Sequence, residues 1–222
     1  MESALTFVLF GLAVVIIIKF GLYSAQAQTR KRLARAPRVT IAAFPEATPA
    51  RIVGRVVDGE RLTSPLCGRP CVFYEVIVQQ RRQSSQSSGW RTIIHETRAI
   101  PFAIDDGTGH ALVDPEGATL VVVKDASSHS GAFDDATPAE EGFLARHNLR
   151  SKGWLFNKKL RYREGALEIG ETIAVCGVGV REPDPDGAAR VTGYRDAPPT
   201  RLRLARSARS PLLISDFDDT KA

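Results

Sequence analysis

The chain has 222 residues, of which 43% are hydrophobic and 25% charged, with a net charge of +5. These are ordinary values for a globular domain, and they exclude a disordered or low-complexity chain. The basic excess is concentrated in residues 30–38 and 201–209, which favours a membrane surface or an acidic partner over a general nucleic-acid binder.

The first element is an apolar segment. Residues 3–18 carry no charge, and Tyr23 follows one interrupting lysine, Lys19. As a helix, residues 5–23 would span about 28 Å, close to the hydrocarbon thickness of a bilayer. Lysine near the end of such a helix can reach the headgroups, and tyrosine suits the interface. The pattern predicts a single transmembrane helix at residues 1–24.

The flanking charges predict its orientation. Only Glu2 precedes the apolar run, whereas a basic group follows it: Arg30, Lys31, Arg32, Arg35 and Arg38. The positive-inside rule then places the N-terminus outside and the following domain in the cytoplasm, with the basic group at the membrane surface. Ala25-Gln26-Ala27 resembles a signal-peptidase site, so a cleaved signal is the alternative to an uncleaved anchor.

After the anchor we predict a basic, proline-rich linker at 25–50, a β-domain at 51–216 and a disordered acidic tail at 217–222. Short alternating or β-branched runs predict strands at 52–57, 71–79, 90–97, 119–123, 160–164 and 172–180. The last of these is apolar on both faces, as in a closed or doubly covered sheet. Gly54 marks a bulge or a close backbone approach.

A β-hairpin is predicted between Pro101 and Pro115. Residues 100–104 and 110–113 are its strands, and Asp106, Gly107 and Gly109 belong to the turn between them.

The remaining elements are less regular. Residues 80–89 are polar and predict a hairpin loop, and residues 124–135 and 167–171 predict a loop and a turn. Thr137-Pro138-Ala139-Glu140 has capping-box spacing, which predicts a helix over 138–148. Leu202 and Leu204 alternate with arginines and suggest an edge strand.

Many short strands with glycine and proline turns predict a mainly β fold. We expect a small OB-like β-barrel or sandwich with one inserted α-helix, preceded by the transmembrane helix.

The order and spacing of several motifs resemble the GIDE domain, also called BAM for "beside a membrane". The residues that carry the resemblance are Ser64, Pro65, Gly68, Pro70, Cys71, Tyr74, Pro101, Phe102, Asp106, Gly107, Gly109, Asp114, Pro115, Gly117, Glu164, Gly170, Gly177, Ser215 and Asp216. The resemblance extends over residues 52–216.

This resemblance implies the membrane part of GIDE- or MULAN-type E3 ubiquitin ligases, in which the domain lies between two transmembrane helices and a RING finger follows. A RING needs two tetrahedral zinc ions with four Cys or His ligands each. The chain has three cysteines and four histidines, so we expect neither a RING nor a second transmembrane helix here. The ligase activity implied by the family therefore lacks its zinc chemistry.

No other reaction is indicated. Cys67 and Cys71 are weak candidates for half of a metal site, but no second pair accompanies them, and the odd number of cysteines fits a reducing compartment. The acidic turn at Asp106 can bind a cation or simply form the hairpin. We find no nucleophile, phosphate or dinucleotide motif and predict no catalytic residue, no metal and no cofactor.

We therefore expect a non-catalytic binding or scaffold module at the cytoplasmic membrane surface, with the lipid bilayer and a protein of unknown identity as partners. The alternatives are a ligase-like activity and OB-like nucleic-acid binding. The second is disfavoured because aromatic residues, which stack on bases, make up only 7% of the chain.

Overall fold

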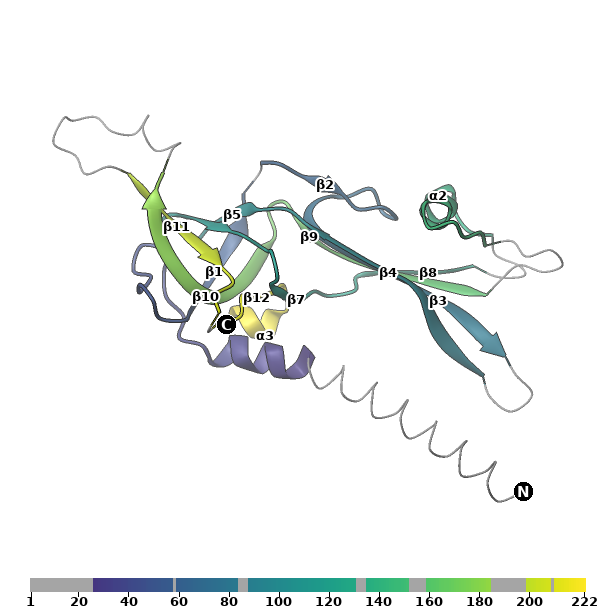
Figure 1. Ribbon diagram of the computed structural model, residues 1–222, viewed down its shortest axis with the longest axis horizontal. Helices are drawn as coiled ribbons and strands as arrows, with labels where there is room; N and C mark the ends of the chain where they lie inside the picture. Colours follow the sequence, from purple (N-terminus) through teal and green to yellow (C-terminus); the bar gives the residue numbers. More distant parts are fainter. Residues whose placement is uncertain are drawn as a thin grey trace, which may run out of the picture.

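The computed structural model describes residues 26–57, 59–83, 88–130, 135–151, 159–184, 199–208 and 210–222. A barrel lies at one end, and a long sheet projects from it (Figure 1). Within these ranges, no helix combines the length and the apolar character needed to cross a bilayer. The predicted transmembrane helix at residues 1–24 lies outside them.

Five strands close the barrel: β1 (Ala50–Val56), β5 (Phe102–Asp105), β6 (His110–Val113), β11 (Thr200–Ala205) and β10 (Thr172–Pro183), which pairs back to β1. The predicted hairpin is confirmed as β5–β6. Gly54 is needed for a close approach, because a Cβ there would lie 2.9 Å from the carbonyl oxygen of Asp105. The mainly β class and the closed barrel are thus confirmed.

The prediction that Leu202 and Leu204 belong to an edge strand is wrong. Strand β11 pairs antiparallel with β10 on one side and parallel with β6 on the other. Both leucines are buried in the barrel core, and the alternating arginines face outward. A barrel strand and an edge strand each bury one face, so alternation alone does not distinguish them.

The predicted linker and tail pack against the barrel. Residues 26–35 are helical, and Leu33 is buried against Ala174 and Leu213. Beyond β12 (Leu213–Ser215), which pairs with β10 and β7 (Thr119–Val121), the chain forms α3 (Asp218–Lys221). The buried Arg51 donates to the carbonyl oxygens of Thr220 and Ala222, each at 2.7 Å. These contacts order the acidic end, which the sequence alone indicates to be disordered.

The projecting sheet, which we term the arm, contains β2 (Leu62–Thr63), β3 (Pro70–Gln83), β4 (Ser88–Ala99), β8 (Ala126–Ser130) and β9 (Leu160–Glu168). Strand β3 is central, with β9 on one side and β4 and β2 on the other, and β8 pairs with the far side of β9. The predicted 124–135 loop thus contains a strand, and β9 extends into the predicted 167–171 turn. Pairing with distant strands overrides their weak local patterns.

The predicted helix is confirmed as α2 (Pro138–Arg146), with its capping box. The Thr137 N–H donates to Glu140 Oε2 at 2.7 Å, and the Glu140 N–H donates to Thr137 Oγ1 at 3.3 Å. Phe143 and Leu144 pack on Tyr162 and neighbouring residues of the arm. This helix therefore covers one face of the arm (Figure 1).

Candidate functional site

A buried carboxylate organises the loop that begins the arm. Glu164 on β9 is 0% exposed, and it accepts hydrogen bonds from the N–H groups of Leu66 at 2.8 Å and Cys67 at 3.3 Å. The hydroxyl of Ser64 accepts from the N–H of Arg69 at 3.1 Å. Gly68 has a φ of +68°, a conformation that favours glycine. Three predicted residues, Ser64, Gly68 and Glu164, therefore come together here.

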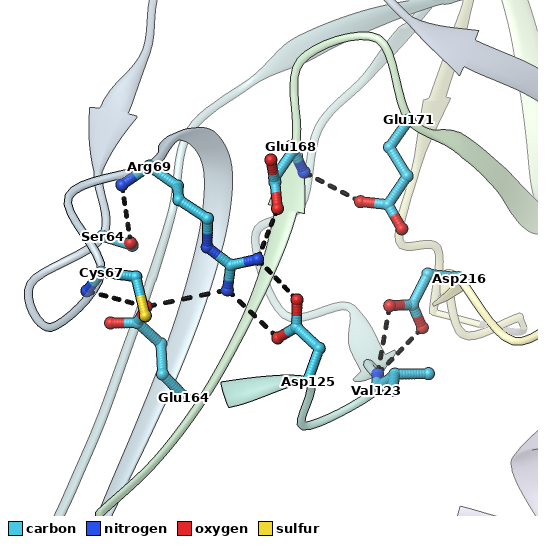
Figure 2. Close-up of polar contacts among 9 residues, drawn as sticks. All are labelled: Ser64, Cys67, Arg69, Val123, Asp125, Glu164, Glu168, Glu171 and Asp216. Atoms are coloured by element: carbon cyan, nitrogen blue, oxygen red, sulfur yellow. Dashed lines mark hydrogen bonds and ion pairs between the residues drawn. The ribbon is translucent and has the colours of Figure 1, made fainter. Parts of the chain in front are cut away.

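Arg69 links this loop to the rest of the molecule (Figure 2). Its guanidinium pairs with Asp125 and with Glu168, each at 2.5 Å, and lies 3.8 Å from Glu164. The hydrogen bond to Asp125 raises the pKa of Arg69 and lowers the pKa of Asp125. One arginine thus joins the loop, the segment before β8 and strand β9.

A hollow of about 450 Å³ lies next to this network, where the arm meets the barrel. Its lining is acidic and partly apolar: Val123, Asp125, Ala166, Glu168, Ile169, Gly170, Glu171 and Asp216. Asp216 accepts from the N–H of Val123 at 3.0 and 3.1 Å, and Glu171 accepts from the N–H of Glu168 at 2.9 Å. The lining can accept hydrogen bonds or pair with a cation, but it supplies no nucleophile.

Burial changes the pKa of two acids that line the hollow, Glu171 and Asp216. It raises the pKa of Glu171, and the nearby charge of Asp216 raises it further. Burial also raises the pKa of Asp216. A carboxyl group with a raised pKa in the folded state makes the protein lose stability as the pH rises through that pKa.

We expect Glu171→Gln to raise the midpoint of thermal unfolding at pH 7 by about 2 °C. The amide oxygen can still accept from Glu168, while the charge next to Asp216 is gone. The gain should vanish below pH 4, where the carboxyl group is protonated in both states. Thermal unfolding from pH 3 to 8 measures this, with Glu116→Gln at an exposed turn as the matched loss of charge. An equal gain for both variants would contradict the assignment.

The three cysteines have the properties of structural thiols. Cys71 and Cys176 are buried, Cys67 is exposed, and all three are free. Burial raises the pKa of Cys67 and of Cys71 to about 11 and also raises the pKa of Cys176. Since the thiolate is the nucleophile and the metal ligand, none is poised to react at neutral pH. No group of three metal-ligating side chains occurs in the described part of the chain.

The acidic turn of the β5–β6 hairpin binds another segment of the same chain. Asp106 accepts from the Thr108 N–H at 2.9 Å and from the Ile41 N–H at 2.7 Å. Gly107 has a φ of +84°. The turn therefore holds the segment before β1 on the barrel, and these bonds lower the pKa of Asp106 against the effect of burial.

The other motif residues are dispersed over the fold. Asp114 pairs with Arg203 at 2.7 Å, and the side chain of Arg206 lies over Gly117. Tyr74 donates to Glu96 at 2.7 Å on the α2 side of the arm. The remaining residues lie in loops, at strand starts or within strands: Pro65, Pro70, Pro101, Phe102, Gly109, Pro115, Gly170, Gly177 and Ser215.

The predicted membrane-surface residues lie on and just after the first described helix. Arg30 faces the barrel, where it pairs with Asp219 at 2.7 Å and lies 4.0 Å from the ring centroid of Phe217. Arg38 donates to the carbonyl oxygen of Lys221. The other three, Lys31, Arg32 and Arg35, are exposed.

Sequence reasoning missed Arg69, Asp125, Glu168 and Glu171 as members of the site. The three acids come from the loop before β8, the end of β9 and the turn before β10, and isolated acids in those places carry no local signal. Asp216, more than forty residues after Glu171, completes the lining.

Comparison with known proteins agrees with the motif resemblance. Residues 74–192, more than half of the chain, match the GIDE family, described as E3 ubiquitin ligase. No curated protein and no solved structure matches the chain. The matched region contains most of the arm, with Glu164 and helix α2, and three barrel strands, two of which form the β5–β6 hairpin. This chain is a member of the GIDE family.

Proposed function

We propose that this protein is a non-catalytic, membrane-anchored binding module whose barrel is held directly beside the bilayer. The observation that carries this proposal is the docking of residues 26–35. Leu33 is fully buried against the barrel, and Arg30 and Arg38 add polar contacts to the C-terminal segment. The helix that follows the predicted span is thus part of the domain rather than a tether.

The distance involved is short. From residue 24 to Leu33 a helix rises about 14 Å, whereas the headgroup layer on one side of a bilayer is about 5–8 Å thick, so Leu33 lies less than about 10 Å beyond that layer. Exposed Lys31 and Arg32 lie within this interval and exposed Arg35 lies two residues after it, where anionic lipid attracts them. This arrangement supports a cytoplasmic domain that stays at the membrane surface.

The chemistry supports binding rather than catalysis. The thiols with raised pKa are protonated at neutral pH, and the lining of the hollow contains no hydroxyl or thiol side chain. The barrel strands, numbered along the chain, follow the order 1-2-3-5-4-1 with one parallel pair, which is the arrangement of OB-like barrels. Such barrels commonly present binding surfaces.

Fractionation of cells that express the full chain tests the anchor. We expect the protein to remain in the membrane pellet after alkaline extraction. We also expect it to resist protease added to spheroplasts and to be digested in inverted vesicles. Digestion in intact spheroplasts, or recovery in the soluble fraction, would contradict the proposed orientation or the anchor. Transfer of ubiquitin by the purified chain with activating and conjugating enzymes would contradict a non-catalytic role.

A further inference from the structure

The arm has one covered and one open face. Tyr74, Val76 and Val78 of β3 face α2 and are buried with it. Alternation along the strands places Gln79, and its cross-strand neighbour Arg161 on β9, on the opposite face. No described helix covers that face. We refer to it as the open face.

The outer part of the open face carries cations without acidic partners. Arg81 on β3 pairs across the sheet with Trp90 on β4, and Arg163 lies two residues from Arg161 on β9. None of the three arginines forms an ion pair with a described carboxylate. Arg161 instead donates to the amide oxygen of Gln79 at 3.1 and 2.5 Å, a neutral partner that leaves its charge uncompensated.

An indole lies among these cations. The guanidinium carbon of Arg161 is 4.6 Å from the ring centroid of Trp90, and the ring of His129 from β8 meets Trp90 edge-on at 6.2 Å. Burial, followed by the charge of Arg163, lowers the pKa of Arg161, as expected where like charges are held together. Nearer the barrel the charges are balanced, because Glu75 pairs with Lys124 and His95.

The open face and the first helix are exposed on the same side of the molecule. In Figure 1, α2 lies above the arm, and residues 26–35 pass under the barrel on the opposite side. Lys31 and Arg35 are two positions before and after Leu33, about 200° around the helix. They therefore point away from the barrel that Leu33 contacts, towards the side that the open face also presents.

We propose that the open face of the arm lies on the anionic headgroups of the same bilayer that anchors the chain. This inference rests on the proposed function, because the anchor brings the face to the membrane. A flat, extended anionic surface contacts the arm and the helix together, whereas a short peptide reaches only one of them. An indole stacked on arginine suits the interfacial layer, and each cation near an anionic surface adds attraction.

The test uses the full chain in lipid nanodiscs. The chain has two tryptophans, so Trp154→Phe leaves Trp90 as the only indole. Discs contain phosphatidylcholine alone or with phosphatidylglycerol, and part of the lipid carries bromine to quench nearby indole fluorescence. We expect quenching of Trp90 in the anionic discs only, and its loss at about 0.5 M salt, where screening is strong.

Two matched double variants assign the effect to the open face. Arg161→Gln with Arg163→Gln should lower the ratio of docked to undocked arm by about 30-fold. Arg91→Gln with Arg98→Gln removes the same charge from exposed positions that register with Gln80 and Tyr74 on the α2 side, and it should leave quenching unchanged. Unaltered thermal unfolding of both variants ensures that the fold is intact.

Three results would overturn the inference. The first is no quenching in anionic discs that do contain the protein, and the second is an equal loss of quenching in both double variants. The third is quenching of Trp90 by a single-stranded oligonucleotide in zwitterionic discs without any effect of anionic lipid, which would assign the face to nucleic acid. Failure of the protein to enter discs at all would instead refute the proposed anchor, and with it this inference.

Discussion

Glu164→Ala is expected to lower the free energy of unfolding by about 3 kcal/mol. The substitution removes a fully buried carboxylate from β9. The N–H groups of Leu66 and Cys67 then lose their acceptor, and Arg69 loses one of three acidic neighbours. Urea unfolding of the full chain in detergent micelles measures the loss, and Glu164→Gln should retain part of the stability because its amide oxygen still accepts one hydrogen bond.

Glu168→Ala is the matched control. Glu168 pairs with the same guanidinium at 2.5 Å, but its side chain is 39% exposed, so solvent screens the interaction and we expect a loss below about 1 kcal/mol. If the two alanine variants lower the free energy of unfolding equally, the buried carboxylate of Glu164 does not hold the loop at 64–69.

Leu33→Ala is also expected to lower the free energy of unfolding by about 3 kcal/mol, since it leaves a cavity against Ala174 and Leu213. The variant also tests whether the first helix is part of the domain. We expect trypsin to cleave after Arg32 and Arg35 much faster than in the parent chain, because cleavage requires the helix to leave the barrel.

Ala34→Gln serves as the control for this helix, because Ala34 is the exposed neighbour of Leu33. Its stability and its trypsin cleavage should match those of the parent. Rapid cleavage of the parent chain itself at Arg32 or Arg35 would show that residues 26–35 form a tether, and it would remove the main support for a barrel held at the membrane.

Local chemistry explains which elements the sequence predicts well. The β5–β6 hairpin is determined by its own turn, in which aspartate carboxylates accept N–H groups two residues on and Gly107 adopts a positive φ. Helix α2 is likewise specified by Thr137 and Glu140, three positions apart. In both cases the interacting groups are only two or three residues apart, so the local order of residue types is enough to predict them.

Elements that have a weak residue pattern of their own and depend on distant partners were not predicted. Strand β8 is the serine-rich run Ala126–Ser130, and it is a strand because β9 pairs with it. The last residues are polar, yet Arg51 of β1 fixes their carbonyl groups. The acidic hollow likewise combines Asp125, Glu171 and Asp216 from separate parts of the chain.

The sequence by itself determined the mainly β class, the hairpin, the capped helix and the family resemblance. The tertiary structure decided that β11 lies inside a closed barrel, that residues 26–35 and 217–222 are packed, and that four acids surround one hollow. The physical reason is the distance along the chain between the groups that interact. Turns and caps are satisfied by groups two or three residues apart, whereas strand neighbours, buried ion pairs and docked ends are chosen by surfaces that exist only after the chain has folded.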